Sequence, residues 1–149
     1  MPCDTRLLTF NERLRLATER QNASDKRLAE CQSQIERAKA SLQAAQEGLD
    51  RAIFDEATAR QAHVDWLYYL NTLPDNGSQV MRQKLVDLFN ANEQLVLNTQ
   101  SARETVSSVQ KAVNEANGDF AIAQAAQWEI AEERNLITGE IAKLSSVSR

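Results

Sequence analysis

The sequence is poor in the residues that interrupt helices. Among its 149 residues it has four glycines and two prolines, and aromatic residues are also scarce. Alanine, glutamine, glutamate and arginine are plentiful instead. This composition is typical of a long helix or a coiled coil, and a chain of this length is usually one domain.

Cysteine and histidine are almost absent. Cys3 and Cys31 are too few for a disulfide framework and stand in no metal-ligand spacing. His63 is the only histidine, which leaves no catalytic triad based on histidine and no multi-histidine metal site. Phosphate loops rich in glycine and Glu-x-x-His pairs of di-iron bundles are absent too. We therefore expect no enzyme, and no catalytic, cofactor-binding or metal-binding residue.

Charge of one sign and long apolar runs are also lacking. The net charge is −4 with both signs interspersed, so no basic stripe indicates nucleic acid as a partner. The apolar runs fall well short of the ~20 residues that span a bilayer, and the N-terminus does not read as a signal peptide. We expect no direct membrane insertion and, with two free thiols, a cytoplasmic protein.

One stretch stands apart from this background, Asn71–Ser78, which reads Asn-Thr-Leu-Pro-Asp-Asn-Gly-Ser. Pro74 cannot continue a helix and pushes Leu73 out of the helical region. Asn76-Gly77 tolerates positive φ, and Ser78 suits the cap of a following helix. The stretch predicts a turn between two long helices.

Both flanking segments carry an apolar seam with the heptad spacing of a coiled coil. Before the turn its rows are Leu7, Leu14, Gln21, Leu28, Ile35, Leu42, Leu49, Glu56, His63, Leu70 and Phe10, Ala17, Ser24, Cys31, Ala38, Ala45, Ala52, Ala59, Trp66, Leu73. After the turn they are Met81, Leu88, Leu95, Ala102, Val109, Ala116, Ala123, Ile130, Ile137, Leu144 and Leu85, Asn92, Thr99, Val106, Val113, Phe120, Gln127, Arg134, Ile141.

The seams match each other when the chain is folded about the turn. Pairing residues whose numbers sum to 151 places Leu28 opposite Ala123 and Leu42 opposite Val109. Large residues often face small ones, as close packing requires. We predict an all-α fold, a single long antiparallel two-helix coiled-coil hairpin over residues 1–149. Its first helix spans about 5–72, capped by Asp4 or Thr5, its turn 73–78 and its second helix about 79–145.

Polar residues interrupt the seam in its terminal part, where Gln21 faces Ile130, Ser24 faces Gln127 and Ala17 faces Arg134. One polar layer commonly sets register, whereas three adjacent layers favour a loosened or splayed section. Trp128, just off the seam, either covers this section or anchors a partner.

A second polar zone lies near the turn, with Glu56, His63, Asn92 and Thr99 on the seam. Apolar residues off the seam accompany it: Phe54, Tyr68, Leu97, Val64, Val86 and Phe89. Either the helices rotate or break here, or the zone is a contact surface for another chain. The candidate partner-binding residues are Phe54, Tyr68, Phe89, Leu97 and Trp128.

The run Leu42-Gln-Ala-Ala-Gln-Glu-Gly-Leu-Asp-Arg-Ala52, the following run Ala57–His63 and the predicted hairpin resemble one family. This family comprises the small stalk proteins of type III secretion systems, of the FliJ/YscO type. The resemblance covers the whole chain in architecture and composition, without a diagnostic motif, and this chain is more alanine-rich and less charged.

The resemblance implies a mechanical role. The open end, built from Leu7–Arg20 and Ile130–Leu144, would enter the export ATPase ring. The rest would reach the export gate or contact chaperones, peripheral to the inner membrane.

Two functions from other classes stay open beside the stalk. One is a helical export chaperone or adaptor that binds a partner through the apolar residues near the turn. The other is a structural spacer that forms a dimer through the same half. The oligomeric state, monomer or homodimer, separates them, because a monomer favours the stalk or the adaptor and a stable dimer favours the spacer.

Overall fold

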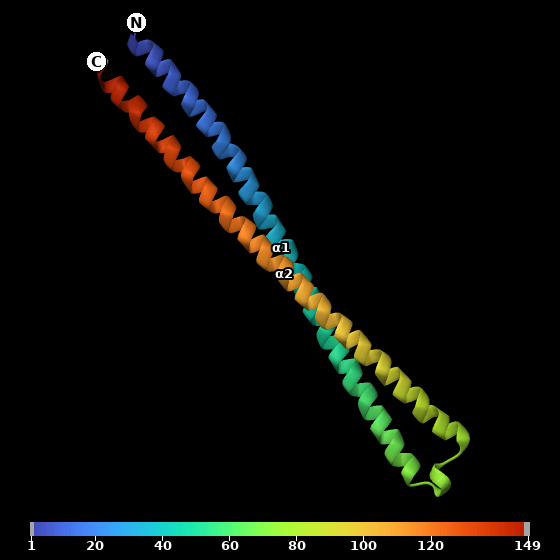
Figure 1. Ribbon diagram of the computed structural model, residues 1–149. Helices are drawn as coiled ribbons and strands as arrows, with labels where there is room; N and C mark the ends of the chain where they lie inside the picture. The colour runs from blue at the N-terminus through green and yellow to red at the C-terminus, as the bar shows by residue number, and fades with distance from the viewer. Residues whose placement is uncertain (1, 148–149) are drawn as a thin grey trace. The chain divides into compact units, whose positions relative to one another are not determined.

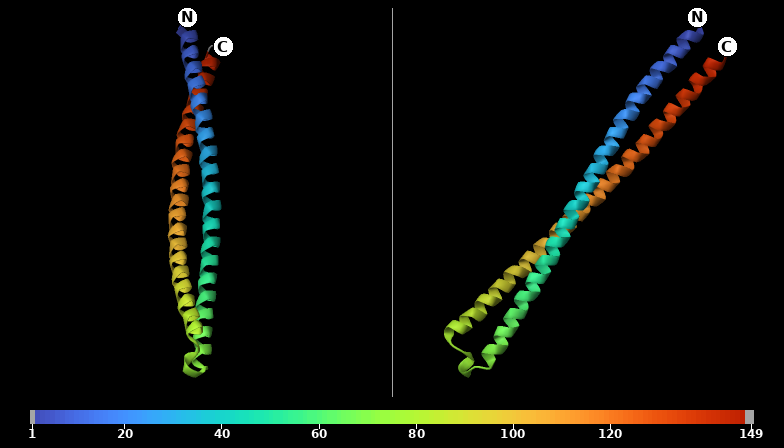
Figure 2. Two further views of the ribbon diagram at one scale, coloured as in Figure 1. Left: turned by 90° about the vertical axis from the view of Figure 1, so that its right-hand side faces the viewer. Right: turned by 180° about the vertical axis from the view of Figure 1, so that it is seen from behind.

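The computed structural model describes the backbone of residues 2–147 and the side chains of residues 9–146. Two long helices, α1 (Pro2–Asn71) and α2 (Gln79–Val147), are joined by a short 3-10 helix, η1 (Pro74–Asn76). The fold is all-α, and α1 and α2 form an antiparallel helical hairpin (Figures 1 and 2).

The helix boundaries differ slightly from the prediction. α1 begins at Pro2 rather than near residue 5, because proline is tolerated in a first turn, where its missing N–H has no helical partner. The proposed caps Asp4 and Thr5 lie outside the described side chains. α2 continues to Val147, two residues beyond its predicted end.

The turn follows the chemistry of its residues. Leu73 is extended, with φ −95° and ψ 150°, as the following proline demands. Gly77 has φ 82°, and the Oγ of Ser78 accepts a hydrogen bond from the N–H of Met81 at 3.3 Å. One feature differs from the prediction, since Asp75 also adopts positive φ, at 55°. Its left-handed conformation closes the tight 3-10 turn that starts at Pro74.

The predicted seam is confirmed in both helices. Every seam position whose side chain is described is buried or half-buried, and Leu7 lies outside the described side chains. Off the seam, the described side chains of α1 and α2 are exposed, with four exceptions that are half-buried: Thr18, Ser33, Ala131 and Glu133. The heptad pattern therefore decides which side of each helix is covered.

Contacts between the helices confirm the predicted register. The Thr99 hydroxyl lies 3.3 Å from the Ala52 carbonyl oxygen across the helices and 3.0 Å from the Leu95 carbonyl oxygen in α2, and its single proton is shared between them. Thr99 and Ala52 are a pair whose numbers sum to 151. The rings of His63 and Phe89, one residue off that register, lie 5.9 Å apart. Thr99 is 4 % exposed and is the buried polar residue of the described part.

The chain divides into two compact units. The terminal unit comprises Met1–Arg37 and Asn114–Arg149, and the turn unit comprises Ala38–Val113. Each unit pairs a segment of α1 with a segment of α2. A single domain over residues 1–149 stays a prediction.

Candidate functional site

The polar section of the terminal unit is closed, so the expectation of a splayed section is wrong. Ala17 is fully buried and Ile137 is 3 % exposed at the terminal end of this section, and Ala123 is 2 % exposed on its turn side. Arg134 Nη1 donates to Gln21 Oε1 at 2.9 Å, across the two helices. The long side chains of Gln21 and Arg134 turn toward each other along the seam, so the helices stay in contact.

Further polar contacts cross between the helices of the terminal unit. Gln127 Nε2 donates to Asp25 Oδ1, and Arg20 Nη2 donates to Glu133 Oε1 at 3.1 Å. The Arg20–Glu133 ion pair is exposed, so its net contribution to stability is small. These contacts nevertheless hold α1 and α2 in one register, because sliding either helix by a turn would separate the partners.

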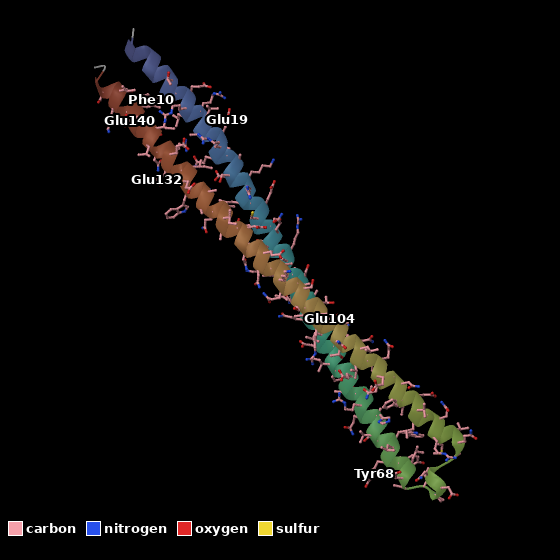
Figure 3. All side chains as sticks on the ribbon, viewed as in Figure 1. Phe10, Glu19, Tyr68, Glu104, Glu132 and Glu140 are labelled. Atoms are coloured by element: carbon pink, nitrogen blue, oxygen red, sulfur yellow. The ribbon has the colours of Figure 1, made fainter. Side chains whose placement is uncertain are left out.

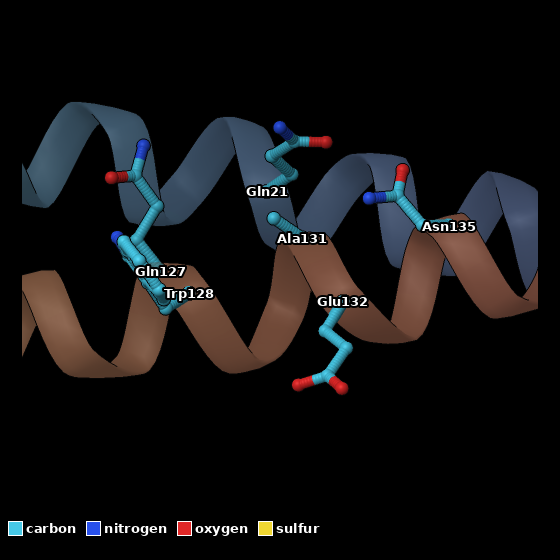
Figure 4. A pocket seen from close by; sticks show the side chains of 6 residues that line it. All are labelled: Gln21, Gln127, Trp128, Ala131, Glu132 and Asn135. Carbon is cyan, nitrogen blue, oxygen red and sulfur yellow. The ribbon is translucent and has the colours of Figure 1, made fainter.

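Trp128 does not cover the polar section. Its side chain is 77 % exposed, and half-buried Thr18 and Ala131 flank the seam instead. Trp128 lines an open hollow of about 520 Å³ whose other walls are Gln21, Gln127, Ala131, Glu132 and Asn135 (Figure 4). An exposed tryptophan beside a polar hollow is suited to contact a partner.

Trp66 joins the two helices of the turn unit next to the turn. Its Nε1 donates to the Met81 carbonyl at 2.9 Å, and the Nζ of Lys84 lies 4.2 Å from the centre of its ring. The Tyr69 ring lies 5.5 Å from the Trp66 ring. This cluster fixes the end of the turn unit where α2 begins.

The helices neither break nor rotate out of register near the second polar zone. Both continue through it, and Glu56, His63 and Asn92 are half-buried at their seam positions. Arg60 Nη2 donates to the half-buried Glu56 at 2.7 Å, and Asn92 Oδ1 is buried without a hydrogen-bond partner. The contact-surface interpretation of the zone therefore remains.

The candidate residues near the turn do not form one patch. Phe54 and Tyr68 are 70 % and 74 % exposed on the surface of α1 that points away from α2, where Figure 3 labels Tyr68. A hollow beside Phe54 is lined by α1 residues alone. Leu97 is 58 % exposed at the corresponding outermost position of α2, so it points away from α1.

Phe89 belongs to a different surface, which lies beside the seam. We call this surface the flank, and its members are half-exposed apolar residues from both helices: Ile53, Val64, Leu67, Val86, Phe89 and Val96. They follow seam residues by one or four positions, on the side where Phe89 meets His63. The heptad positions contain the signal for this surface, whereas apolar character alone does not separate Phe89 from Phe54, Tyr68 and Leu97.

The described residues also limit what the site can hold. Among them, no group of three or more histidine, cysteine, aspartate or glutamate residues could bind a metal ion. Over the same residues, neither helix contains a stretch long and apolar enough to span a membrane. Phe54, Tyr68, Phe89, Leu97 and Trp128 stay predicted partner-binding residues.

Comparison of the chain with protein-family models, curated proteins and solved structures finds no match.

Proposed function

We propose that the protein is a non-enzymatic coupling protein that works through contacts with other proteins, as the stalk of a type III secretion export apparatus. The observation that carries this proposal is the helical hairpin with its seam in one register. The resemblance to the stalk family supplies the specific partners, which are the export ATPase ring, the export gate and chaperones. The protein would then act in the cytoplasm, peripheral to the inner membrane through the apparatus.

The terminal unit has properties that suit insertion into a ring. Two side-chain hydrogen bonds between its helices, Arg134 to Gln21 and Arg20 to Glu133, oppose sliding of one helix along the other. A force applied to one helix is therefore shared by the other. Trp128, exposed beside this section, would supply an aromatic contact to the ring.

The test measures binding and turnover of the secretion ATPase with the full chain. We expect co-purification and a higher ATPase rate, and Trp128→Ala should reduce both. Val80→Ala removes an exposed apolar residue of the turn unit and serves as the matched control. Absence of binding and of stimulation by the unaltered chain would reject the stalk.

An adaptor or chaperone role is the second candidate, and the flank favours it. Half-exposed apolar residues from two helices form the kind of surface that receives an amphipathic helix of a partner. Phe89→Glu should then abolish capture of an export substrate while ATPase stimulation persists. If Phe89→Glu instead lost ATPase stimulation and kept substrate capture, the result would contradict the adaptor role and favour the stalk.

A further inference from the structure

The residues of the flank belong to a second heptad seam, which is confined to the turn unit. In α1 its positions are Ile53, Ala57, Arg60, Val64, Leu67 and Asn71, and in α2 they are Arg82, Val86, Phe89, Glu93, Val96 and Gln100. The spacings alternate between four and three residues, as in the first seam. The positions that would extend it, such as Gln46 and Arg103, are polar.

The second seam points about 100° away from the first, because each of its positions follows a first-seam position by one residue. In a four-helix bundle each helix has two such seams, one toward each neighbour, and its apolar side is wider than in a two-helix coiled coil. The two second seams lie on the same side of the hairpin, because His63 of α1 contacts Phe89 of α2 there. Lys84 contacts Trp66 from the opposite side.

The second seam of α1 matches that of α2 position by position. Pairing residues whose numbers sum to 153 gives six pairs: Ile53 with Gln100, Ala57 with Val96, Arg60 with Glu93, Val64 with Phe89, Leu67 with Val86, and Asn71 with Arg82. Apolar residues face apolar ones in three of the six pairs. Basic Arg60 of α1 is paired with acidic Glu93 of α2, so the surface is also complementary to itself in charge.

Within one chain these two seams cannot pack on each other, since α1 and α2 already meet through the first seam. We propose that a second copy of this chain occupies the flank, related by a two-fold axis parallel to the helices of the turn unit. α1 of each copy then packs antiparallel against α2 of the other, which makes a four-helix bundle of the two turn units. Arg60 of each copy faces Glu93 of the second copy, and Val64 and Leu67 lie against Phe89 and Val86 of the second copy.

The dimer is weak and reversible. Each apolar member of the flank is already covered to half or more by its own hairpin, so each adds little newly buried apolar area to a dimer. We therefore expect a dissociation constant on the order of micromolar. The inference rests on the turn unit alone and does not depend on the stalk proposal, whose ATPase test has a separate readout.

Analytical ultracentrifugation of the full chain over a concentration series, from about 1 to 300 μM, tests the proposal. We expect a monomer–dimer equilibrium with a midpoint inside this range. A chain that stays monomeric at the highest concentration overturns the proposal and leaves the flank to a different protein. A trimer or an open-ended series of oligomers overturns it too, because a two-fold contact closes on itself.

Variants then locate the interface. Val86→Glu places a charge on the flank twice per dimer and should weaken dimerisation on the order of 100-fold or more. Ile122→Glu adds the same charge at an exposed apolar position of the terminal unit and should leave the dimer unchanged. Equal effects of the two substitutions, or none from Val86→Glu, would show that the flank is not the interface.

A charge exchange tests the pairing itself. Glu93→Arg should weaken the dimer by opposing Arg60 of the second copy, and adding Arg60→Glu should restore most of the affinity. Helicity measured on the same samples controls for unfolding, because Arg60 also contacts Glu56 within its own helix. Absence of rescue with helicity retained would contradict the proposed register.

Discussion

Trp66 shows how one side chain ties the end of the turn unit together. Its indole N–H reaches the carbonyl of Met81, in the first turns of α2, and Lys84 covers the ring face. A seam tryptophan was predictable from the heptad pattern. The hydrogen bond was not, because it depends on the orientation of the indole within the seam.

Trp66→Phe keeps an aromatic ring on the seam but removes the indole donor. We expect the free energy of unfolding to fall by about 1 kcal/mol, the usual net contribution of one hydrogen bond. Urea titration followed by circular dichroism measures this change. Tyr69→Phe removes an exposed hydroxyl from the neighbouring ring and is the control, and an equal loss in both variants would contradict the role of the indole N–H.

Two glycines should respond oppositely to replacement by alanine. Gly118 lies within α2 with open space around it, so Gly118→Ala should raise the free energy of unfolding by up to ~1 kcal/mol. Gly77 has positive φ, and an added Cβ would meet Leu70 at 3.0 Å, so Gly77→Ala should lower the melting temperature. A lower melting temperature of Gly118→Ala would show that this glycine serves a purpose beyond filling the helix surface.

The pKa of the Glu12 carboxyl reports its contact with Arg15. Hydrogen bonding and charge from Arg15 hold the pKa of the Glu12 carboxyl below its ordinary value. Since the folded pKa is depressed, the contact stabilises the helix above the ordinary carboxylate pKa and is lost as the pH falls through the lowered value. A titration followed by NMR should return the pKa to its ordinary value in Arg15→Gln, and an unchanged pKa would exclude the contact.

At the scale of the helices, burial follows the heptad pattern. Leu28, Leu42 and Ala123 are covered as expected because the seam repeats without a slip in both helices. The turn was equally predictable, since Pro74 and Gly77 restrict the backbone more than any packing does.

The polar section is less predictable than the apolar seam. The heptad register pairs Gln21 with Ile130 and Arg134 with Ala17. In the structure Gln21 and Arg134 contact each other one helical turn away from the predicted register. Long flexible side chains reach along the helix axis, so polar layers are less predictable than apolar ones.

The Gln21–Arg134 contact can be tested by a double-mutant cycle. Gln21→Leu alone removes an acceptor from Arg134, whose Nε is already buried without a partner, and should cost about 1–3 kcal/mol. Adding Arg134→Leu should recover that stability or exceed it, because the layer becomes apolar. Thermal unfolding of the single and double variants measures both effects, and a double variant no more stable than Gln21→Leu would contradict them.

The candidate site was predicted only in part, for a geometrical reason. Phe89 is half-exposed on the flank, and its role in partner binding stays a prediction. Phe54 and Leu97 differ from Ile53 and Val96 by one residue each, which is about 100° of rotation on a helix. That rotation carries them away from the flank, so apolar character without heptad position could not define the surface.

At the scale of the whole chain, two-helix units bury little. The described side chains that are buried are Ala17, Cys31, Leu70, Thr99, Val113, Ala123 and Ile137, and no large side chain among them is fully covered. Stability therefore depends on many half-buried seam residues in series, which leaves α1 and α2 dependent on correct register. A partner that covers the flank would add stability to the turn unit.

The pairing of α1 with α2 in one register underlies every proposal above, and cysteine cross-linking tests it most directly. Both native cysteines are replaced by alanine, and Leu42→Cys is combined with Val109→Cys or, one heptad away, with Ala102→Cys. We predict rapid intramolecular disulfide formation in the first variant and little in the second. Preferential cross-linking of Cys at position 42 to position 102, or no cross-link in either variant, would contradict the antiparallel register and the surfaces derived from it.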